Sequence, residues 1–459
     1  MTTWEDLLST ALVGTSRRTV DHLTVGTETI HADSAEATVL AAAALAAGYR
    51  RAGWTPPTWR GTPTPPAEPD DRPECTSAAA QLLELLLNRG IRVEGGPEPL
   101  AVHWLRSARD AGQRPPYRLI VDLLRFGTAN AATRPLVKVV IGPRGAWLAQ
   151  HNPSWRWAAA VRPQDVVEHF ATGTRAERLA LLADLRAAEP DFARTLIEDT
   201  WADEQAATRA SFLDTLHTGL SISDEPFLER ALDDRAATVR AVAAALLDRL
   251  PESARARRMA ERARNLELPD EPDESARRDG ITDHREPGYG RAASWLIQIL
   301  AATPLSTWHT DQIEKAEREV VIGWTKAALR QRNQEWLTAL ASHQPSPELI
   351  AALTPEAATG ILDRQKKLDA RFGGLLAAAP GPWPPEFSVA IVNRLRANKA
   401  NNVLQLAAPA LAEHLDPTTL AAVEAWLLTL GADEKATRRA LRGIAHALTI
   451  RATIRQEFA

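Results

Sequence analysis

The clearest structural pattern in this sequence lies at residues 224–251, DEPFLERALDDRAATVRAVAAALLDRLP. This stretch predicts two helices joined by a short acidic turn. In the second helix, the apolar side chains recur at a spacing that places them on one face: Val239, Ala243, Leu246, Leu247 and Leu250. Neither helix can bury such a stripe alone, so neighbouring helix pairs must cover it. The pattern therefore predicts an all-α fold, an α-solenoid of stacked antiparallel helix pairs.

The same stretch resembles a HEAT repeat in the aspartate of its turn, Asp234, and in the Val-Arg pair that follows, Val239 and Arg240. In HEAT repeats these aspartate and arginine positions tend to pair between adjacent units, and the resemblance implies such a pair for Asp234 and Arg240. The expected fold is thus a HEAT-like α-solenoid with an irregular N-terminal part and a helical C-terminal block.

Shifts in composition divide the chain into four regions. Residues 1–160 predict an N-terminal helical region with a loop at 55–73, where the density of proline excludes a helix. Residues 161–264 carry the HEAT-like repeats. Residues 265–290 are acidic and poor in large apolar side chains, so we expect a mobile linker there. Residues 291–459 return to helical patterning and form a C-terminal helical region.

Two stretches interrupt the helical pattern of the N-terminal region. In residues 15–34 the pattern fades into polar and β-branched residues, which predicts a loop or a small hairpin. Further along, Gly142 and Pro143 separate two short elements, because a Gly-Pro pair interrupts a helix.

Charge and composition limit the classes of protein to consider. Lys and Arg number 54 against 58 for Asp and Glu, a net charge of −4, so the chain as a whole does not attract a polyanion or an anionic membrane. The start, MTTWEDLL, lacks the pattern of a secretory signal, and no apolar run approaches the ~20 residues of a spanning helix. The single cysteine, Cys75, excludes an intrachain disulfide and fits a reducing compartment. We therefore expect a cytoplasmic protein without a membrane partner.

Catalytic and metal sites need particular side chains at particular spacings. The histidines are scattered singly, without the pair one helical turn apart that binds zinc. The sequence also lacks a phosphate-binding glycine loop and a serine-nucleophile motif. We therefore expect no enzymatic activity, no metal and no cofactor. An active site assembled from several helices would leave no local motif, so that alternative stays open.

A first candidate binding surface is aromatic. Trp147, Trp155, Arg156 and Trp157 lie close together in the sequence, and Trp and Arg are enriched at binding hot spots. They could grip a peptide or stack a nucleobase, and Arg240 is a further candidate for contact with a partner. The alternative interpretation is a core junction in which the tryptophans pack against the helix stack.

A second candidate surface is basic. Its members, which could contact phosphates, are Lys366, Lys367, Arg371, Arg394 and Arg396. Most such runs are solvated helix faces, and that interpretation is kept beside the first.

Three segments together resemble an uncharacterised family, a domain of unknown function common in actinobacteria. They are WEDLLSTALVGTSRR at 4–18, RPLVKVVIGPRGAWLAQHNPSWRW at 134–157 and the HEAT-like unit at 224–251. Members of that family are often encoded beside a SWIM-type zinc-finger protein, a MoxR-type AAA ATPase and von Willebrand A-domain proteins. The resemblance implies a partner within a multi-protein system.

These observations favour a non-catalytic scaffold whose stacked helix pairs bind a partner protein. The alternative is a HEAT-like nucleic-acid-binding protein that resembles the alkylpurine DNA glycosylases, which present a basic concave face to the duplex. The direction in which the arginines point would separate the two hypotheses.

Overall fold

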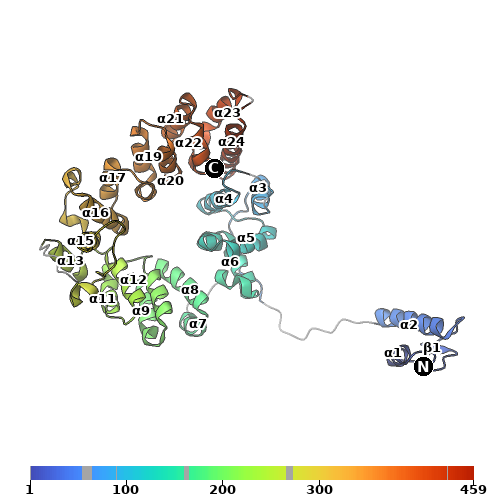
Figure 1. The fold of residues 1–459 in the computed structure, drawn as a ribbon. Coiled ribbons are helices and arrows are strands. Elements are labelled where there is room, and N and C mark those ends of the chain that lie inside the picture. Colours follow the sequence, from blue (N-terminus) through green and yellow to red (C-terminus); the bar gives the residue numbers. More distant parts are fainter. Residues whose placement is uncertain are drawn as a thin grey trace. The chain divides into compact units, whose positions relative to one another are not determined.

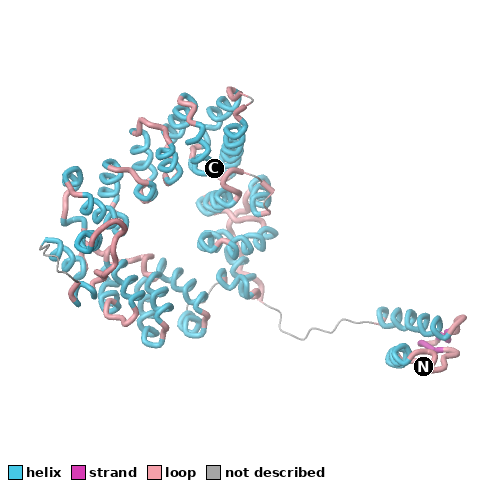
Figure 2. Tube along the Cα trace, in the orientation of Figure 1, coloured by secondary structure: helices cyan, strands magenta, loops and turns pink. Residues whose placement is uncertain are grey.

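A computed structural model describes residues 2–53, 65–88, 90–91, 93–159, 165–264, 272–431 and 433–459. Within these residues nearly all of the regular secondary structure is helical, and the two strands form a single short hairpin (Figures 1 and 2). The predicted all-α class is confirmed. The chain forms two compact units, Met1–Pro66 and Ala67–Ala459.

The first unit packs two helices against a hairpin. Its elements are α1 (Trp4–Val13), β1 (Leu23–Val25), β2 (Glu28–Ile30) and α2 (Ala35–Ala52). The strands pair antiparallel with Leu23 opposite Ile30, so residues 15–34 contain the hairpin and not a plain loop. A capping box between Thr3 and Asp6 starts α1, and the Ser34 hydroxyl caps α2. Part of the predicted proline-rich loop, residues 55–64, lies outside the described residues.

The second unit begins with helices that enclose Trp104. They are α3 (Ser77–Leu87), α4 (Glu98–Asp110), η1 (Tyr117–Leu119), α5 (Ile120–Ala129), η2 (Ala131–Thr133), α6 (Arg134–Gln150) and η3 (Pro153–Ala158). The Trp104 side chain is fully buried, and its Nε1 donates a hydrogen bond of 2.9 Å to the carbonyl oxygen of Ala79. This bond satisfies the one polar group of a large apolar side chain.

Helix α6 is broken at Gly142, as the sequence predicts. Gly142 has a φ of 58°, and Pro143 has no N–H to donate to the carbonyl of Val139. Arg72 replaces the lost donor, with hydrogen bonds of 2.8 Å to the Val139 oxygen and 3.2 Å to the Val140 oxygen. Asp70 holds the Arg72 guanidinium in place at 2.7 Å. The end of the predicted proline-rich loop is therefore anchored to the break in α6.

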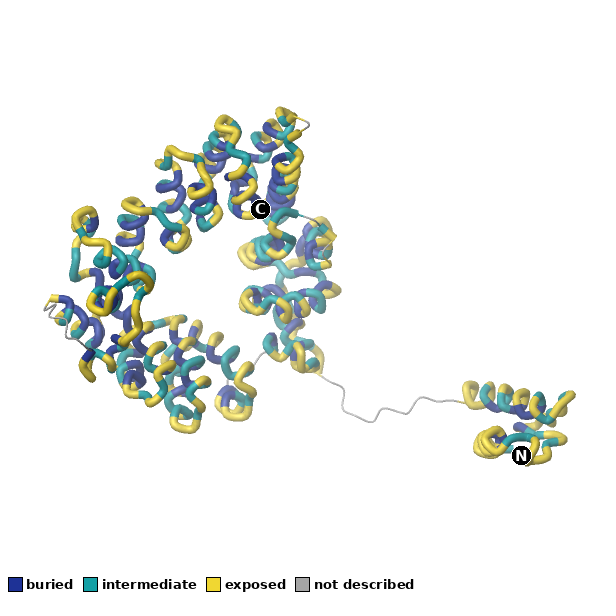
Figure 3. Tube along the Cα trace, viewed as in Figure 1, coloured by how far each residue is buried: buried dark blue, intermediate teal, exposed yellow. Residues whose placement is uncertain are grey.

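The next helices stack in pairs, and those from α7 to α12 share one apolar core. They are α7 (Val166–Thr172), α8 (Arg175–Ala188), α9 (Pro190–Thr200), η5 (Trp201–Asp203), α10 (Ala206–Thr215), η6 (Ile222–Asp224), α11 (Glu225–Ala231), α12 (Ala237–Leu247) and α13 (Ala254–Arg264). The predicted stripe is buried at all five positions, from Val239 to Leu250. Figure 3 shows buried residues gathered where neighbouring helices face each other.

Buried arginine–aspartate pairs join successive helix pairs. Arg186 of α8 reaches Asp224 before α11 at 2.9 Å, and Arg209 of α10 reaches Asp234 at 2.9 Å. The expected pair between Asp234 and Arg240 is therefore wrong, because the Asp234 carboxylate pairs with Arg209 instead. Arg240 instead donates to the backbone oxygen of Asp234 at 2.7 Å and braces the turn.

Residues 272–290 differ from the mobile linker expected for 265–290. They contain α14 (Glu274–Arg278), followed by Asp279, which is fully buried, and Ile281, which joins an apolar cluster with Met259 and Trp295. Residues 265–271 lie outside the described residues.

The C-terminal helices continue the stack, beginning with α15 against α13. They are α15 (Arg291–Ala302), η7 (Leu305–Thr307), η8 (Thr310–Lys315), α16 (Arg318–Gln331), α17 (Gln334–His343), α18 (Pro347–Ala351), α19 (Pro355–Arg364), α20 (Ala370–Ala378), α21 (Pro385–Ala397), α22 (Asn401–His414), η9 (Pro417–Thr419), α23 (Leu420–Leu428) and α24 (Lys435–Glu457).

The last helix of the second unit packs against its first helices. In Figure 1 the red helix α24 lies beside α3 and α4, and it contacts both. Ile450 and Ile454 are buried in the same apolar cluster as Trp104, and the ring of Phe458 meets that of Trp104 edge-on at 5.1 Å. The first and last helices of the second unit are therefore in direct contact with each other.

Candidate functional site

A groove along α8, α10 and α12 has a volume of about 910 Å³. Its walls are mostly small or apolar side chains, namely Pro135, Leu179, Ala183, Ala187, Ala210, Ser211, Thr215, Thr218 and Val242. A hollow of this size and character is typical of a binding site.

The groove follows from the two faces of α8. The large side chains Leu181 and Leu182 are buried in the core between helices, whereas Ala183 and Ala187 are exposed one turn apart. On α10, the Ser211 hydroxyl donates to the backbone oxygen of Ala207 at 2.9 Å, so this polar side chain folds back onto its own helix. Small side chains on adjacent helices leave room for another segment to approach closely.

The rim of the groove is acidic. Asp184 and Asp214 are both exposed, and the described residues that line the groove include no lysine or arginine. Lys138 approaches Asp184 from α6 with its Nζ at 2.5 Å from the carboxylate. The Asp214 carboxylate forms no ion pair with the described residues, so it is available to a cation from outside the chain.

Two members of the predicted tryptophan set, Arg156 and Trp157, line a second hollow of about 260 Å³ that shares Asp184 with this groove. Trp155 and Trp157 are partly buried against the core of the first helices. The Trp157 indole rests on Gly127, where a Cβ atom would come within 2.4 Å of the ring, and donates to the Thr128 hydroxyl at 3.1 Å. Trp147 packs edge-on against His151, with ring centroids 4.7 Å apart.

Arg156 is the most accessible member of that set. Its side chain is 59% exposed and lies 3.1 Å from the Glu177 carboxylate. The backbone N–H and hydroxyl of Thr174, together with Arg156, lower the pKa of Glu177 to about 2. Arg156 therefore has a permanently charged partner on α8 and helps to join η3 to that helix.

The predicted basic set is only partly brought together. Lys366, Lys367 and Arg371 line a hollow of about 380 Å³, along with His343 and Asp369. Arg394 donates to the backbone oxygens of Asp363 and Gln365, so it holds a turn in place. Arg396 does not line this hollow and is half-buried on α21.

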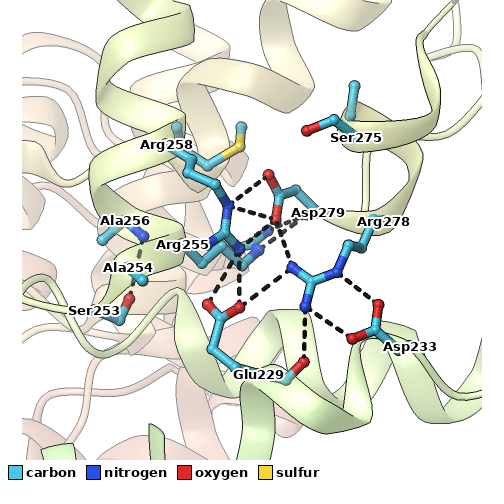
Figure 4. Close-up of polar contacts among 12 residues, drawn as sticks. Glu229, Asp233, Ser253, Ala254, Arg255, Ala256, Arg258, Ser275, Arg278 and Asp279 are labelled. Atoms are coloured by element: carbon cyan, nitrogen blue, oxygen red, sulfur yellow. Dashed lines mark hydrogen bonds and ion pairs between the residues drawn. The ribbon is translucent and has the colours of Figure 1, made fainter. Parts of the chain in front are cut away.

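The densest polar cluster was not predicted from the sequence. Figure 4 shows Arg258 and Arg278 facing the carboxylates of Glu229, Asp233 and Asp279. Arg258 lies 2.6 Å from Asp279 and 3.1 Å from Glu229, and Arg278 lies 2.6 Å from Asp233. Although burial opposes ionisation, hydrogen bonds from Arg258 and Arg262 hold the pKa of Asp279 below its usual value. The charges compensate one another, so the cluster joins α11, α13 and α14 and leaves no free reactive group.

The family follows from comparison of the sequence with protein-family models. A model described as a family of unknown function, DUF5691, matches residues 6–458. The chain belongs to DUF5691. No curated protein and no solved structure matches it. The family match covers nearly the whole chain, so both compact units are part of the DUF5691 sequence.

Three further observations describe the chemistry available to this DUF5691 member. No group of three or more His, Cys, Asp or Glu side chains is placed to hold a metal ion within the described residues. No helix in the described part of the chain is long and apolar enough to cross a membrane. Burial raises the pKa of the Cys75 thiol to about 11, so the thiol is protonated at neutral pH.

Proposed function

We propose that this chain is a non-catalytic helical scaffold that binds a partner protein through the groove of α8, α10 and α12. The observation that carries the proposal is the groove itself, about 910 Å³ in volume, with a floor of small side chains and two exposed aspartates on its rim. Helical-repeat proteins commonly use such surfaces to bind other proteins.

The groove favours an amphipathic segment with an apolar face and basic flanks. Ala183, Ala187 and Ala210 allow close approach of a partner backbone, which suits a helix laid into a groove. Asp214 would then meet a lysine or arginine side chain of that segment, whereas Asp184 already pairs with Lys138. Exposed charges of this kind contribute more to the rate and specificity of association than to affinity.

The partner follows from the family resemblance. That resemblance implies neighbouring genes for a MoxR-type AAA ATPase, a SWIM-type zinc-finger protein and von Willebrand A-domain proteins. The proposed partner is one of these proteins, and the scaffold would position it within a common assembly.

The proposal is tested by a substitution that fills the groove without changing a buried residue. Ala187 is exposed in the groove and Ala188 is exposed on the same helix but does not line it. We expect Ala187→Trp to weaken binding of the partner at least tenfold in a titration with purified proteins, and Ala188→Trp to leave it unchanged. Equal binding by the two variants, with both folded, would contradict the proposal.

The alternative function, nucleic-acid binding, has one observation in its favour. Lys366, Lys367 and Arg371 converge on one hollow, although Asp369 lies beside them. A gel shift at about 50 mM salt tests it, because phosphate contacts strengthen as salt falls. Binding that Lys366→Glu with Lys367→Glu abolishes would support this alternative, and the absence of any shift would eliminate it.

A further inference from the structure

A second cleft lies where the two ends of the second unit meet. It has a volume of about 350 Å³, enough for a small molecule. One wall comes from α4 and the loop before it, and the other comes from α22, α24 and the turn at Gly381 and Pro382. A ligand in this cleft would contact both the first and the last helices of the unit.

The buried cation in this cleft is Arg451 of α24. Arg451 is only 6% exposed, and it donates to the backbone oxygen of Leu415 at 2.5 Å. No carboxylate of the described residues lies within ion-pair distance of its guanidinium, unlike the buried Arg186, Arg209 and Arg255, which all have an aspartate partner. An arginine cannot lose its charge in a protein, and a buried charge without a counter-ion is costly. The guanidinium of Arg451 therefore lacks a carboxylate in direct contact within the described residues.

Two further side chains that line the cleft, Arg106 and His103, come from α4. Arg106 is exposed at the mouth of the cleft and forms no ion pair with described residues, and His103 lies one turn before it. Burial, together with the charges of Arg451, Arg106 and Arg455, lowers the pKa of His103 to about 4. The imidazole is therefore neutral near pH 7 and can donate one N–H to an oxygen.

Three carboxylates also line the cleft. Asp110 is already paired with Arg109 at 2.7 Å, Glu413 is exposed, and Glu94 is half-buried. Burial lowers the pKa of the neighbouring His414 and the charge of Glu413 opposes that shift, whereas no carboxylate is among the causes that act on His103. The charges of Asp416 and Glu413 do act on Arg451, but neither carboxylate forms an ion pair with its guanidinium.

We propose that this cleft binds a small oxyanion, a carboxylate or phosphate group on a small molecule, through Arg451 and Arg106. Guanidinium groups recognise both kinds of oxyanion through paired N–H donors. Because the cleft is shared by α4 and α24, the bound anion would add contacts between the two ends of the second unit and stabilise their packing. This ligand site is separate from the proposed partner groove.

The experiment measures binding of inorganic phosphate and of citrate to the full chain by isothermal titration, with chloride matched for ionic strength. We expect saturable binding of at least one of the two, and protection of α4 and α24 from hydrogen exchange on binding. Saturation by phosphate alone or by citrate alone would assign the class of oxyanion. Binding of neither would overturn the proposal.

Two variants test the residues. Arg451→Gln removes the buried cation, but it also removes the donor to Leu415 and can impair folding. Arg106 is exposed, so Arg106→Gln should not impair folding. We expect this variant to weaken binding about tenfold, which corresponds to the loss of one charged hydrogen bond. The matched control is Arg125→Gln, whose side chain is 70% exposed on α5 and outside the cleft. Equal effects of Arg106→Gln and Arg125→Gln would overturn the assignment.

Discussion

Replacement of Arg186 by methionine tests whether buried arginines hold successive helix pairs together. The Arg186 side chain has no exposed area and makes a two-point contact with Asp224, at 3.0 and 2.9 Å. It also donates to four backbone oxygens, those of Pro190, Leu216, Thr218 and Gly219. One side chain thus connects α8 to the start of α9 and to the turn that leads into α11.

The expected cost follows from these contacts. Removal of one partner from a buried ion pair costs about 3–5 kcal/mol. Asp224 would keep Arg194 at 3.2 Å and the Ser221 N–H at 3.1 Å, which lowers the cost. Four backbone oxygens would lose a hydrogen-bond donor, which raises the energetic cost of the substitution. We expect Arg186→Met to lower the free energy of unfolding by about 4 kcal/mol, a large share of the ~5–15 kcal/mol typical of a folded protein.

The assay is urea denaturation followed by tryptophan fluorescence, together with hydrogen exchange of α8–α11. Trp201 reports on this region, because its ring meets that of Phe227 edge-on at 5.0 Å. The control is Arg230→Met, whose side chain is 63% exposed beside Glu198 and should cost less than about 1 kcal/mol. If Arg186→Met were no more destabilising than this control, the buried pairs would not hold the stack.

Three further predictions concern other parts of the second unit. Asp279→Asn should cost about 2–4 kcal/mol and expose α13 and α14 to hydrogen exchange, because Arg258 and Arg262 lose their shared carboxylate, whereas the exposed Asp283→Asn should change nothing. Gly142→Ala should cost at least about 2 kcal/mol, because the residue has a φ of 58° and its Cβ would lie 2.2 Å from Arg72 Nη2; Gly374→Ala, with nothing within 4 Å, should keep or slightly raise stability. His103 has a pKa lowered to about 4 by burial and nearby arginines, so the folded state takes up this proton less readily than the unfolded chain. The contribution of neutral His103 to the free energy of unfolding is therefore complete above about pH 6.5 and is lost as the pH falls toward 4. In denaturation curves measured across this pH range, His103→Gln should reduce the loss of stability by up to about 3 kcal/mol. An unchanged pH dependence in His103→Gln would contradict this assignment.

The features that the sequence predicts correctly are those determined by neighbouring residues. The stripe from Val239 to Leu250 is buried because helical spacing alone places it on one face. The break at Gly142 is predicted because Pro143 cannot donate to a helical carbonyl wherever it lies.

The features that the sequence does not reveal depend on distant partners. Asp279 lies in an acidic stretch that is typical of a linker, yet Arg258 and Arg262 from α13 compensate its charge and allow its burial. The partner of Asp234 is Arg209, 25 residues earlier, and not the arginine six residues later that repeat spacing implies. The groove is likewise hidden, because its small residues come from separate helices and form no local motif.

The most direct test of the scaffold proposal is site-specific photo-crosslinking in living cells of the native organism. A photoreactive amino acid is placed at Ala187 in the groove or, as a control, at Thr195, which is exposed on α9 and does not line the groove. The proposal predicts one defined protein adduct from position 187 and none from position 195. The same adducts from both positions, or none from position 187, would contradict the claim that this groove binds a partner protein.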